Sequence, residues 1–391
     1  MTAVERFMKY VTFGTDSNEN SNCCPSTPGQ LTLANYLVKE LKGIGVADAF
    51  HDGRGYVYGH IPATPGCENV EKIGLIAHMD TSPDVSGATV QPIRVVYDGS
   101  NVALLDDSFL GEEMIVSAGE TLLGADDKAG VAEIVAACEV LLNDPSIRHG
   151  QISIGFTPDE EIGRGADGFD LKVFNADYGY TVDGGVLGEI ESENFNAASA
   201  DLTVYGLNTH PGSAKGKMKN ALLFLHEWMA LLPPEQTPEH TEGREGFYHV
   251  NDVTGDVSQA KAHLILRDHD RAEFEKKKAY LAQITAFLNE KYGEGTFALE
   301  MRDTYYNMRE IVDQHPAIVK RAQDAMTACG VTPILKPIRG GTDGALLSYM
   351  GLPCPNLSTG GLNFHSKHES IPVSSLLKMT EVLVCLVTSR P

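Results

Sequence analysis

Residues 157–163, TPDEEIG, place three carboxylates in a row: Asp159, Glu160 and Glu161. They follow the largely apolar run 151–156, and a short apolar run bounded by polar residues is typical of a buried strand. Neighbouring negative charges repel one another, and the repulsion grows as water is removed. A buried strand that ends in three acids therefore predicts a bound cation beside it.

Other ligand-type side chains stand at similar places in the chain. They are His78 and Asp80 after one apolar run, the pair Asp126-Asp127, Asp183 after another run, and His365 in the loop NFHSKHES. Any one of these sites alone is more often a cap or a surface residue, but together they favour a metal centre. Mixed imidazole and carboxylate ligands suit zinc. Because a carboxylate can bridge two ions, we expect two metals about 3.5–4 Å apart.

Glu160 and Glu161 can share one place if a dication removes most of their repulsion. We expect one of them to bind metal and the other to stay unliganded, close enough to take a proton from water. Two assignments stay open from the residues alone. Asp127 competes with Asp126 for the bridge, and His368 competes with His365 for the last ligand position.

The elements that must position these residues alternate between strand and helix. Helical apolar spacing covers 28–47 and 128–144, and short apolar runs cover 72–80, 151–157 and 177–183. This alternation predicts an α/β fold with a mostly parallel sheet. Open sheets of this kind place ligands at the carboxyl ends of their strands, where the acids and histidines stand.

The pattern changes from 197 to 304 and then returns. Strands are expected at 198–206, 246–258, 261–270 and 296–304, with helices at 219–232 and 272–292. This βαββαβ order is the ferredoxin-like split motif, and it is complete in itself. We therefore predict a discontinuous α/β domain, 1–196 and 305–391, with a second domain inserted at 197–304. The alternative is one continuous domain.

Composition restricts the partners and the compartment. The net charge is −22, from 53 acidic and 31 basic residues, and such a surface repels nucleic acid and anionic membranes. Seven scattered cysteines argue for a reducing compartment. The first residues lack the features of a signal peptide, and no apolar run approaches the roughly 18 residues of a membrane span. We expect a cytoplasmic protein without nucleic-acid or membrane partners.

Several sequence blocks resemble the M20 family of zinc metallopeptidases, which includes acetylornithine deacetylase. They are HMDTSPD (78–84), GADDKAG (124–130), TPDEEIG (157–163) and TVDGG (181–185), followed by the late histidine. Blocks such as HPGSAKGKMKNA, EGFYH, RDHDR and KPIRGGTDGA make the chain most similar to the tripeptide aminopeptidases of that family. The likeness covers essentially the whole chain. It implies a zinc-peptidase-like catalytic domain with an inserted ferredoxin-like domain for lid and dimer contacts.

The resemblance implies two zinc ions per subunit, with cobalt or manganese as substitutes. His78 and Asp183 would hold the first zinc, Glu161 and His365 the second, and Asp126 would bridge both. The family pattern thus chooses Asp126 over its neighbour, and the acid four residues after His365 favours that histidine. The resemblance also implies a cis peptide bond after Asp126.

Further roles follow from the same resemblance. Glu160 would be the general base and later the acid that protonates the leaving amine. Asp80 would orient His78, and His210 in the inserted domain would stabilise the oxyanion. Planar arginine donors suit a peptide's C-terminal carboxylate. The candidates for binding it are Arg267 and Arg339, with Asn220 as a supporting donor.

These roles imply a metal-dependent aminopeptidase that releases the N-terminal residue from tripeptides with a free N-terminus. The resemblance also allows a homodimer through the inserted lid domain, and the sequence does not decide whether His210 acts in its own chain or in the second copy. A dipeptidase or an N-acyl amidohydrolase with the same two-metal site is the nearest alternative. A catalytically silent zinc protein is disfavoured, because neither Glu160 nor Asp80 is needed merely to hold metal. A dinucleotide-binding enzyme lacks support, because no GxGxxG opens a helix after a strand.

Overall fold

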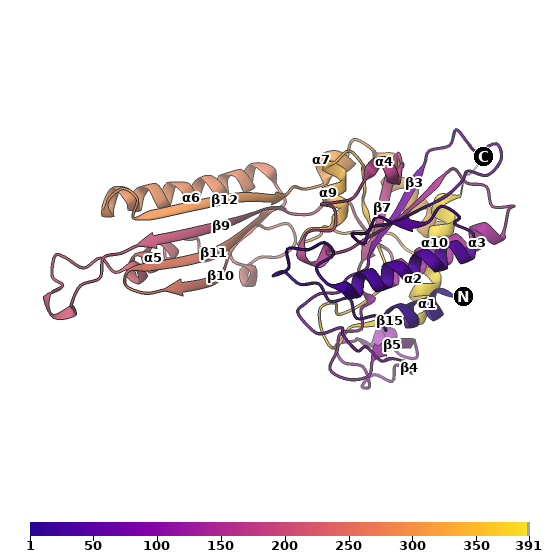
Figure 1. The fold of residues 1–391 in the computed structure, drawn as a ribbon, viewed down its shortest axis with the longest axis horizontal. Coiled ribbons are helices and arrows are strands. Elements are labelled where there is room, and N and C mark those ends of the chain that lie inside the picture. The colour runs from indigo at the N-terminus through magenta and orange to yellow at the C-terminus, as the bar shows by residue number, and fades with distance from the viewer. Residues whose placement is uncertain (389–391) are drawn as a thin grey trace. The chain divides into compact units, whose positions relative to one another are not determined.

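A computed structural model describes residues 1–388 of the chain (Figure 1). The chain divides into two compact units. Unit 1 comprises residues 1–192, 308–336 and the chain from 342 onward, and unit 2 comprises residues 193–307 and 337–341. No helix among residues 1–388 combines the length and the apolar character needed to cross a bilayer.

Unit 1 is built on an eight-stranded sheet in the order β1-β2-β6-β3-β7-β14-β8-β13. Its strands are β1 (Phe50–His51), β2 (Val57–Ile61), β3 (Ile73–His78), β6 (Ile152–Thr157), β7 (Tyr178–Gly184), β8 (Glu189–Glu191), β13 (Ile334–Leu335) and β14 (Asn356–Ser358). The four central strands, β6, β3, β7 and β14, run parallel to one another. β3, β6 and β7 are almost wholly buried, as their continuous apolar runs predict. The mostly parallel sheet is confirmed.

Helices cover this sheet, and α3 is the one closest to the site. Unit 1 contains α1 (Ala3–Tyr10), α2 (Pro28–Ile44), α3 (Ala125–Asn143), α4 (Leu171–Phe174), α7 (Arg309–Val312), α8 (Pro316–Ala328), α9 (Asp343–Tyr349) and α10 (Val373–Val387), with short 3-10 turns η1 (Asp107–Phe109) and η2 (Glu160–Ile162). Helix α3 packs on β3 and β7 and against α1, α2 and α10. A Cβ at Gly130 would lie 1.9 Å from the carbonyl oxygen of Val182, so this glycine lets α3 approach β7 closely.

A small antiparallel sheet completes unit 1. It has the order β15-β5-β4, with β4 (Pro92–Val96), β5 (Glu113–Ser117) and β15 (Ser370–Pro372). β15 follows the loop that contains His365, and Leu362 and Ser370 close that loop with two backbone hydrogen bonds of 2.8 and 3.0 Å. The sheet therefore fixes both ends of the loop that presents His365.

Unit 2 has the element order β9 (Asn196–Tyr205), η3 (Pro211–Ser213), α5 (Ala221–Met229), η4 (Pro238–His240), β10 (Phe247–Gly255), β11 (Gln259–Asp268), α6 (Arg271–Tyr292) and β12 (Phe297–Tyr305). Its sheet order is β10-β11-β9-β12, and all neighbours are antiparallel. Trp228 of α5 is fully buried and donates to Thr285 of α6 at 3.0 Å, which ties the two helices together over the sheet. The ferredoxin-like arrangement is confirmed, while the domain bounds 1–196, 197–304 and 305–391 stay a prediction.

Candidate metal centre

The predicted metal ligands of unit 1 stand where three parallel strands end. β3 ends at His78, which is in register with Thr157 at the end of β6, and β7 carries Asp183. Asp126 stands at the start of α3, and Glu161 lies in η2 directly after β6. Because these strands are parallel neighbours, their carboxyl ends meet at one edge of the sheet.

The structure gathers these side chains into two groups that share Asp126. In the first group, Nε2 of His78 lies 2.8 Å from Oδ1 of Asp126 and 3.3 Å from Oδ1 of Asp183. In the second, Nε2 of His365 lies 3.3 Å from Oδ2 of Asp126 and 3.0 Å from Oε2 of Glu161. One oxygen of Asp126 therefore faces each group, which is the arrangement that a bridging ligand requires.

The donor atoms fit a divalent cation in each group. Oε1 of Glu161 is buried and has no hydrogen-bond partner among the described residues. Burial, followed by the charge of Asp126, raises the pKa of Glu161 to about 7. Burial likewise raises the pKa of Asp183 to about 7. Acids crowded in this way are costly to ionise without a cation, and nitrogen and oxygen donors together suit zinc or a similar metal.

The same crowding also raises the pKa of the two histidines, which favours their charged form. Hydrogen bonds with Asp126 and Glu161 raise the pKa of His365 to about 11. Burial alone would lower the pKa of His78, but the neighbouring acids raise it well above its usual range. Both shifts mean that this edge of the sheet stabilises positive charge strongly.

Glu160 lies beside the two groups but belongs to neither. Burial raises the pKa of its carboxyl well above the usual range, and the charges of Asp183, Asp343 and Glu161 act in the same direction. A carboxylate that favours its protonated form at this place is suited to accept a proton from water.

Asp80 connects the two parts of the site. Its backbone oxygen lies 3.1 Å from Nδ1 of His78, and its Oδ1 lies 3.3 Å from the same nitrogen. Its carboxylate also accepts hydrogen bonds from the backbone N–H groups of Glu160 and Glu161, at 3.0 and 3.1 Å. Fully buried Asp80 thus fixes both the orientation of the His78 ring and the position of η2.

Asp159, the first acid of the triplet, points away from the metal groups. Its carboxylate accepts hydrogen bonds from the backbone N–H of Ser26 and from Nε2 of Gln30, both at 2.7 Å. Its φ of 59° puts it in the left-handed region, which turns the chain between β6 and η2. Asp159 therefore links the segment that contains Ser26 and Gln30 to the end of β6 through hydrogen bonds.

Asp127 and His368, the two residues that competed for ligand positions, belong to neither ligand group among residues 1–388. Asp127 is buried, and its carboxylate accepts from the backbone N–H groups of His78 and Gly130. The peptide bond between Asp126 and Asp127 is cis, as the resemblance implies.

Two buried charged groups near the site were not anticipated from the sequence. Asp343 accepts a hydrogen bond from Oγ1 of Thr157 at 2.8 Å, and burial raises its pKa to about 7. Lys128 donates to the carbonyl of Phe13 at 2.8 Å, and burial lowers its pKa to about 8. The glycine-rich block around Asp343 was a usable signal, whereas helical periodicity assigns a lysine such as Lys128 to the surface.

The four predicted residues outside unit 1 lie in unit 2. His210 is exposed, and its Nδ1 accepts from the backbone N–H of Gly212 at 3.1 Å. Asn220 caps the N-terminus of α5 by accepting from Leu222 at 3.0 Å. The guanidinium of Arg267 lies over the ring of Tyr305, at 5.0 Å. The contacts of Arg339 are different and more numerous.

Arg339 is held by backbone and aromatic groups of unit 2. Its guanidinium lies 5.1 Å from the ring of Phe195 and 5.7 Å from that of Phe247. It donates to the carbonyls of Thr241, Gly243 and Glu245, at 2.8–3.3 Å. Most of its donors are therefore already in use.

The structure brings Arg267 and Arg339 together but separates them from His210 and Asn220. Phe247, which contacts Arg339, pairs with Arg267 across β10 and β11. Arg267 in turn pairs with Ala197 near the start of β9, whereas the loop with His210 and Asn220 leaves the other end, after Tyr205. Ala197 and Tyr205 are about 26 Å apart at roughly 3.3 Å per residue. Figure 1 shows the β9–α5 loop running beyond that end of the sheet.

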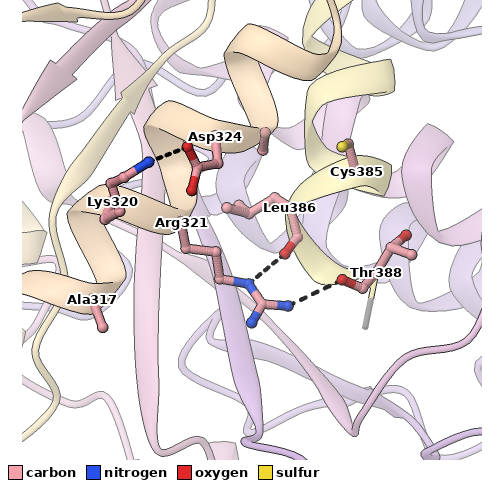
Figure 2. Close-up of a pocket in the computed structure, with 8 residues that line it drawn as sticks. Ala317, Lys320, Arg321, Asp324, Cys385, Leu386 and Thr388 are labelled. Carbon is pink, nitrogen blue, oxygen red and sulfur yellow. Dashed lines mark hydrogen bonds and ion pairs between the residues drawn. The ribbon is translucent and has the colours of Figure 1, made fainter. Parts of the chain in front are cut away.

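A cavity of about 310 Å³ lies elsewhere in unit 1, between α8 and the end of α10 (Figure 2). Arg321 of α8 lines it and donates to the carbonyls of Leu386 and Thr388, at 2.6 and 3.3 Å. Its charge thus caps the C-terminus of α10. None of the predicted site residues lines this cavity.

Comparisons with known proteins identify the family of this chain. The model of peptidase family M20/M25/M40 matches residues 122–389. Peptidase T of Parabacteroides distasonis is 52% identical over 402 residues, which cover 99% of this chain and 98% of the relative. Peptidase T of Caldanaerobacter subterraneus subsp. tengcongensis is 51% identical over 399 residues, which cover 98% and 97%.

Solved structures show the same fold. The aminopeptidase PepT of Bacillus cereus has a TM-score of 0.80 at 26% identity, over 98% of this chain and 97% of that one. A tripeptidase of Staphylococcus aureus has a TM-score of 0.79 at 21% identity, over 98% and 96%, and shows the fold alone. With a family match over more than half of the chain and relatives about half identical over nearly all of it, the expected family is confirmed, and this chain belongs to peptidase family M20/M25/M40.

Proposed function

We propose that this chain is a metal-dependent aminopeptidase that releases the N-terminal residue from tripeptides, with two zinc ions per subunit. The observation that carries the proposal is the pair of ligand groups that share Asp126, with Glu160 beside them. The relatives named Peptidase T and the aminopeptidase structure support the choice of substrate. Cobalt or manganese could occupy similar ligands.

Glu160 is the proposed proton carrier of the reaction. When bound, two zinc ions supply Lewis-acid chemistry, because they lower the pKa of a water molecule towards about 7 and polarise the scissile carbonyl. Glu160 takes one proton from the attacking water molecule, while the oxygen of that water forms the new bond to the carbonyl carbon. The same carboxyl then returns the proton to the departing amine as the peptide bond breaks. Asp80 holds the backbone of Glu160 in place throughout.

His210 is the proposed donor to the developing oxyanion. Because its Nδ1 accepts from the backbone N–H of Gly212, the proton of the neutral ring is on Nε2. The exposed ring can therefore donate from Nε2 to a substrate oxygen.

Arg267 and Arg339 are the proposed anchors for the C-terminal carboxylate, with Asn220 as the supporting donor. Arg267 is the freer of the two, since the one hydrogen bond that its guanidinium makes among residues 1–388, to the carbonyl of Leu266, is long, at 3.4 Å. Arg339 would have to exchange some of its bonds to the 241–245 segment. A fixed anchor at one end would let the enzyme select peptides by length.

A homodimer through unit 2 would allow residues from the two opposite ends of its sheet to act on the same substrate. His210 and Asn220 stand roughly 26 Å along β9 from the arginine pair, whereas an extended tripeptide spans at most about 11 Å. One copy of unit 2 therefore cannot place all four side chains on one tripeptide. A second copy could supply His210 and Asn220. A cytoplasmic location without nucleic-acid or membrane partners fits the charge of −22 and the scattered cysteines.

A panel of four substrates tests the proposal. The purified protein is stripped of metal, reconstituted with zinc, and given free trialanine, its N-acetylated form, its C-amidated form and dialanine. We expect metal-dependent release of the N-terminal residue from free trialanine, with weaker cleavage of the amidated form because the carboxylate anchor is lost. Preference for the acetylated peptide would contradict the proposal and favour an N-acyl amidohydrolase, and preference for dialanine would favour a dipeptidase.

A further inference from the structure

Glu369 is a buried acid that the proposed mechanism does not use. Its side chain is 2% exposed, and its two oxygens accept three backbone hydrogen bonds. Oε2 accepts from the N–H groups of Leu123 and Gly124, at 2.8 and 2.7 Å, and Oε1 accepts from the N–H of Asp126 at 2.9 Å. Among residues 1–388, no other acid of the centre accepts hydrogen bonds from three backbone N–H groups of a single turn.

The turn 123–126 is shaped to hold a carboxylate. Gly124 has φ 83°, in the left-handed region, so that successive N–H groups converge on one point. Asp126 is the last residue of this turn and the residue shared by both ligand groups. The bond from its N–H to Glu369 therefore fixes the backbone from which the shared ligand projects.

Glu369 also belongs to the loop that presents His365. The backbone pair of Leu362 and Ser370 closes this loop. Inside it, Oγ of Ser366 donates to the carbonyl of Asn363 at 2.7 Å, and the N–H of Glu369 donates to the carbonyl of Ser366 at 3.2 Å. A short loop that is bonded at its ends and within itself holds Glu369 and His365 at a fixed separation.

One loop therefore contacts Asp126 at two places. Glu369 holds its backbone N–H, and the ring of His365 lies 3.3 Å from its carboxylate. Building on the two-metal site of the proposed function, we propose that Glu369 is a positioning residue for the second metal group. It sets the distance between Asp126 and His365. The ligand atoms of the second group, which also includes Glu161, are thereby kept close enough together to bind one cation.

The first group depends on Glu369 only through the shared Asp126. His78 and Asp183 project from adjacent parallel strands of the main sheet. The His78 ring is held by Asp80, and the backbone of His78 is held by the carboxylate of Asp127. Loss of Glu369 thus affects the second group, made by a loop, far more than the first, made by strands.

Zinc affinity of the Glu369→Gln variant tests this directly. Glutamine keeps the size of the side chain but replaces one acceptor oxygen by a donor, so at least one of the three buried N–H groups loses its partner. We expect the second zinc to bind roughly 10- to 100-fold more weakly, as for other partners of metal ligands, while the first zinc, which is affected only through Asp126, weakens much less. Equilibrium dialysis with metal analysis, and calorimetric titration of the metal-free protein, measure both steps.

Three further variants make the result specific. His365→Ala and His78→Ala show how loss of the second or the first group changes the titration, and Glu369→Gln is expected to resemble the former. Asp170→Asn is the matched control. It also changes a carboxylate that accepts backbone hydrogen bonds, from Lys172 and Val173, but away from the metal groups. It is expected to leave both zinc steps unchanged.

The outcomes separate this inference from the proposed function. Equal weakening of both zinc steps, or no weakening, in Glu369→Gln overturns the inference if the wild type binds two ions. A wild type that binds fewer than two overturns the two-metal proposal itself. If Glu369→Gln does not fold, Ser366→Ala replaces it, because it loosens the same loop without leaving the buried N–H groups unpaired. It is expected to weaken the second step alone, and unchanged affinity would overturn the inference.

Discussion

At the scale of single residues, three adjacent acids have three different sets of contacts. Asp159 is bonded to Ser26 and Gln30, Glu160 stands beside the ligand groups, and Glu161 is part of one of them. The left-handed backbone at Asp159 turns the chain, so that neighbours in sequence do not face the same way. The repulsion expected between the three acids is thus reduced in two ways. Hydrogen bonds stabilise the charge of Asp159, and Glu161 belongs to a group that can bind a cation.

This difference predicts opposite results for two conservative changes. Glu160→Gln is expected to lower kcat roughly 10²- to 10⁴-fold, since it removes the proton acceptor, while the protein keeps both zinc ions. Glu161→Gln is expected to lose one zinc ion. Steady-state kinetics with trialanine, together with the zinc content after dialysis, checks both. Loss of zinc from Glu160→Gln would contradict the assignment of the two neighbours, and Glu160→Asp serves as the control that keeps the charge.

Residue types and their place in the chain predicted a metal centre, but the choice of Asp126 and His365 over their neighbours came from the family resemblance. His78 and Asp183 stand at the ends of strands whose apolar runs are plain in the sequence, and Asp126 stands at the start of α3. The hydrogen-bond partners around them were not predictable in the same way. Glu369 reaches the turn at Asp126 across more than two hundred residues, and no local pattern encodes such a contact.

At the scale of elements, periodicity predicted the long and regular segments. β3, β6, β7, α3 and the βαββαβ order of unit 2 are confirmed because each buries a continuous run or a clear stripe. The small β15-β5-β4 sheet was missed. Its strands have three to five residues, and β4 is largely exposed, so that no apolar pattern distinguishes it from a loop.

Helix α3 contains a feature with a measurable effect on stability. Glu133 is fully buried, and neither carboxylate oxygen has a hydrogen-bond partner among residues 1–388. Burial raises its pKa well above the usual 4.5. The folded chain therefore keeps a proton at Glu133 that the unfolded chain releases above about pH 4.5, so this group lowers the free energy of unfolding as the pH rises towards the folded pKa.

Glu133→Gln is expected to remove that dependence. Relative to the wild type, the variant should become more stable with each step from pH 6 to pH 9, by at most about 1.4 kcal/mol per pH unit. Melting temperatures of the two zinc-loaded proteins, measured in parallel by calorimetry, check this. Comparison with the wild type cancels the other buried acids, which are common to both proteins. Parallel melting curves over the whole pH range would mean that Glu133 is ionised in the folded chain.

At the scale of the whole molecule, the length of one strand limits what a single copy can do. The arginine pair is near the start of β9, and His210 follows its end. The sequence predicted His210, Asn220, Arg267 and Arg339 as candidates, but it did not predict the distance between them. Their order along the chain does not show which end of the sheet each residue occupies. A symmetric pair exchanges equivalent residues, so each copy can complete the site of the other.

Mixing two inactive variants tests whether His210 acts across such a pair. His210→Ala and Glu160→Gln are each expected to be nearly inactive alone. In a mixed dimer, one of the two sites has both defects and the other has intact Glu160 with an intact His210 from the second copy. Random exchange makes half of the dimers mixed, so activity should recover to about a quarter of the wild-type value if His210 acts across the dimer. Co-expression with two different tags, followed by isolation of the doubly tagged species, leaves only mixed dimers, whose activity should be about half of the wild-type value. Recovery would assign His210 to the second copy, whereas mixed dimers as inactive as the two parents would show that each chain uses its own His210 and that the separation along β9 is overcome in another way.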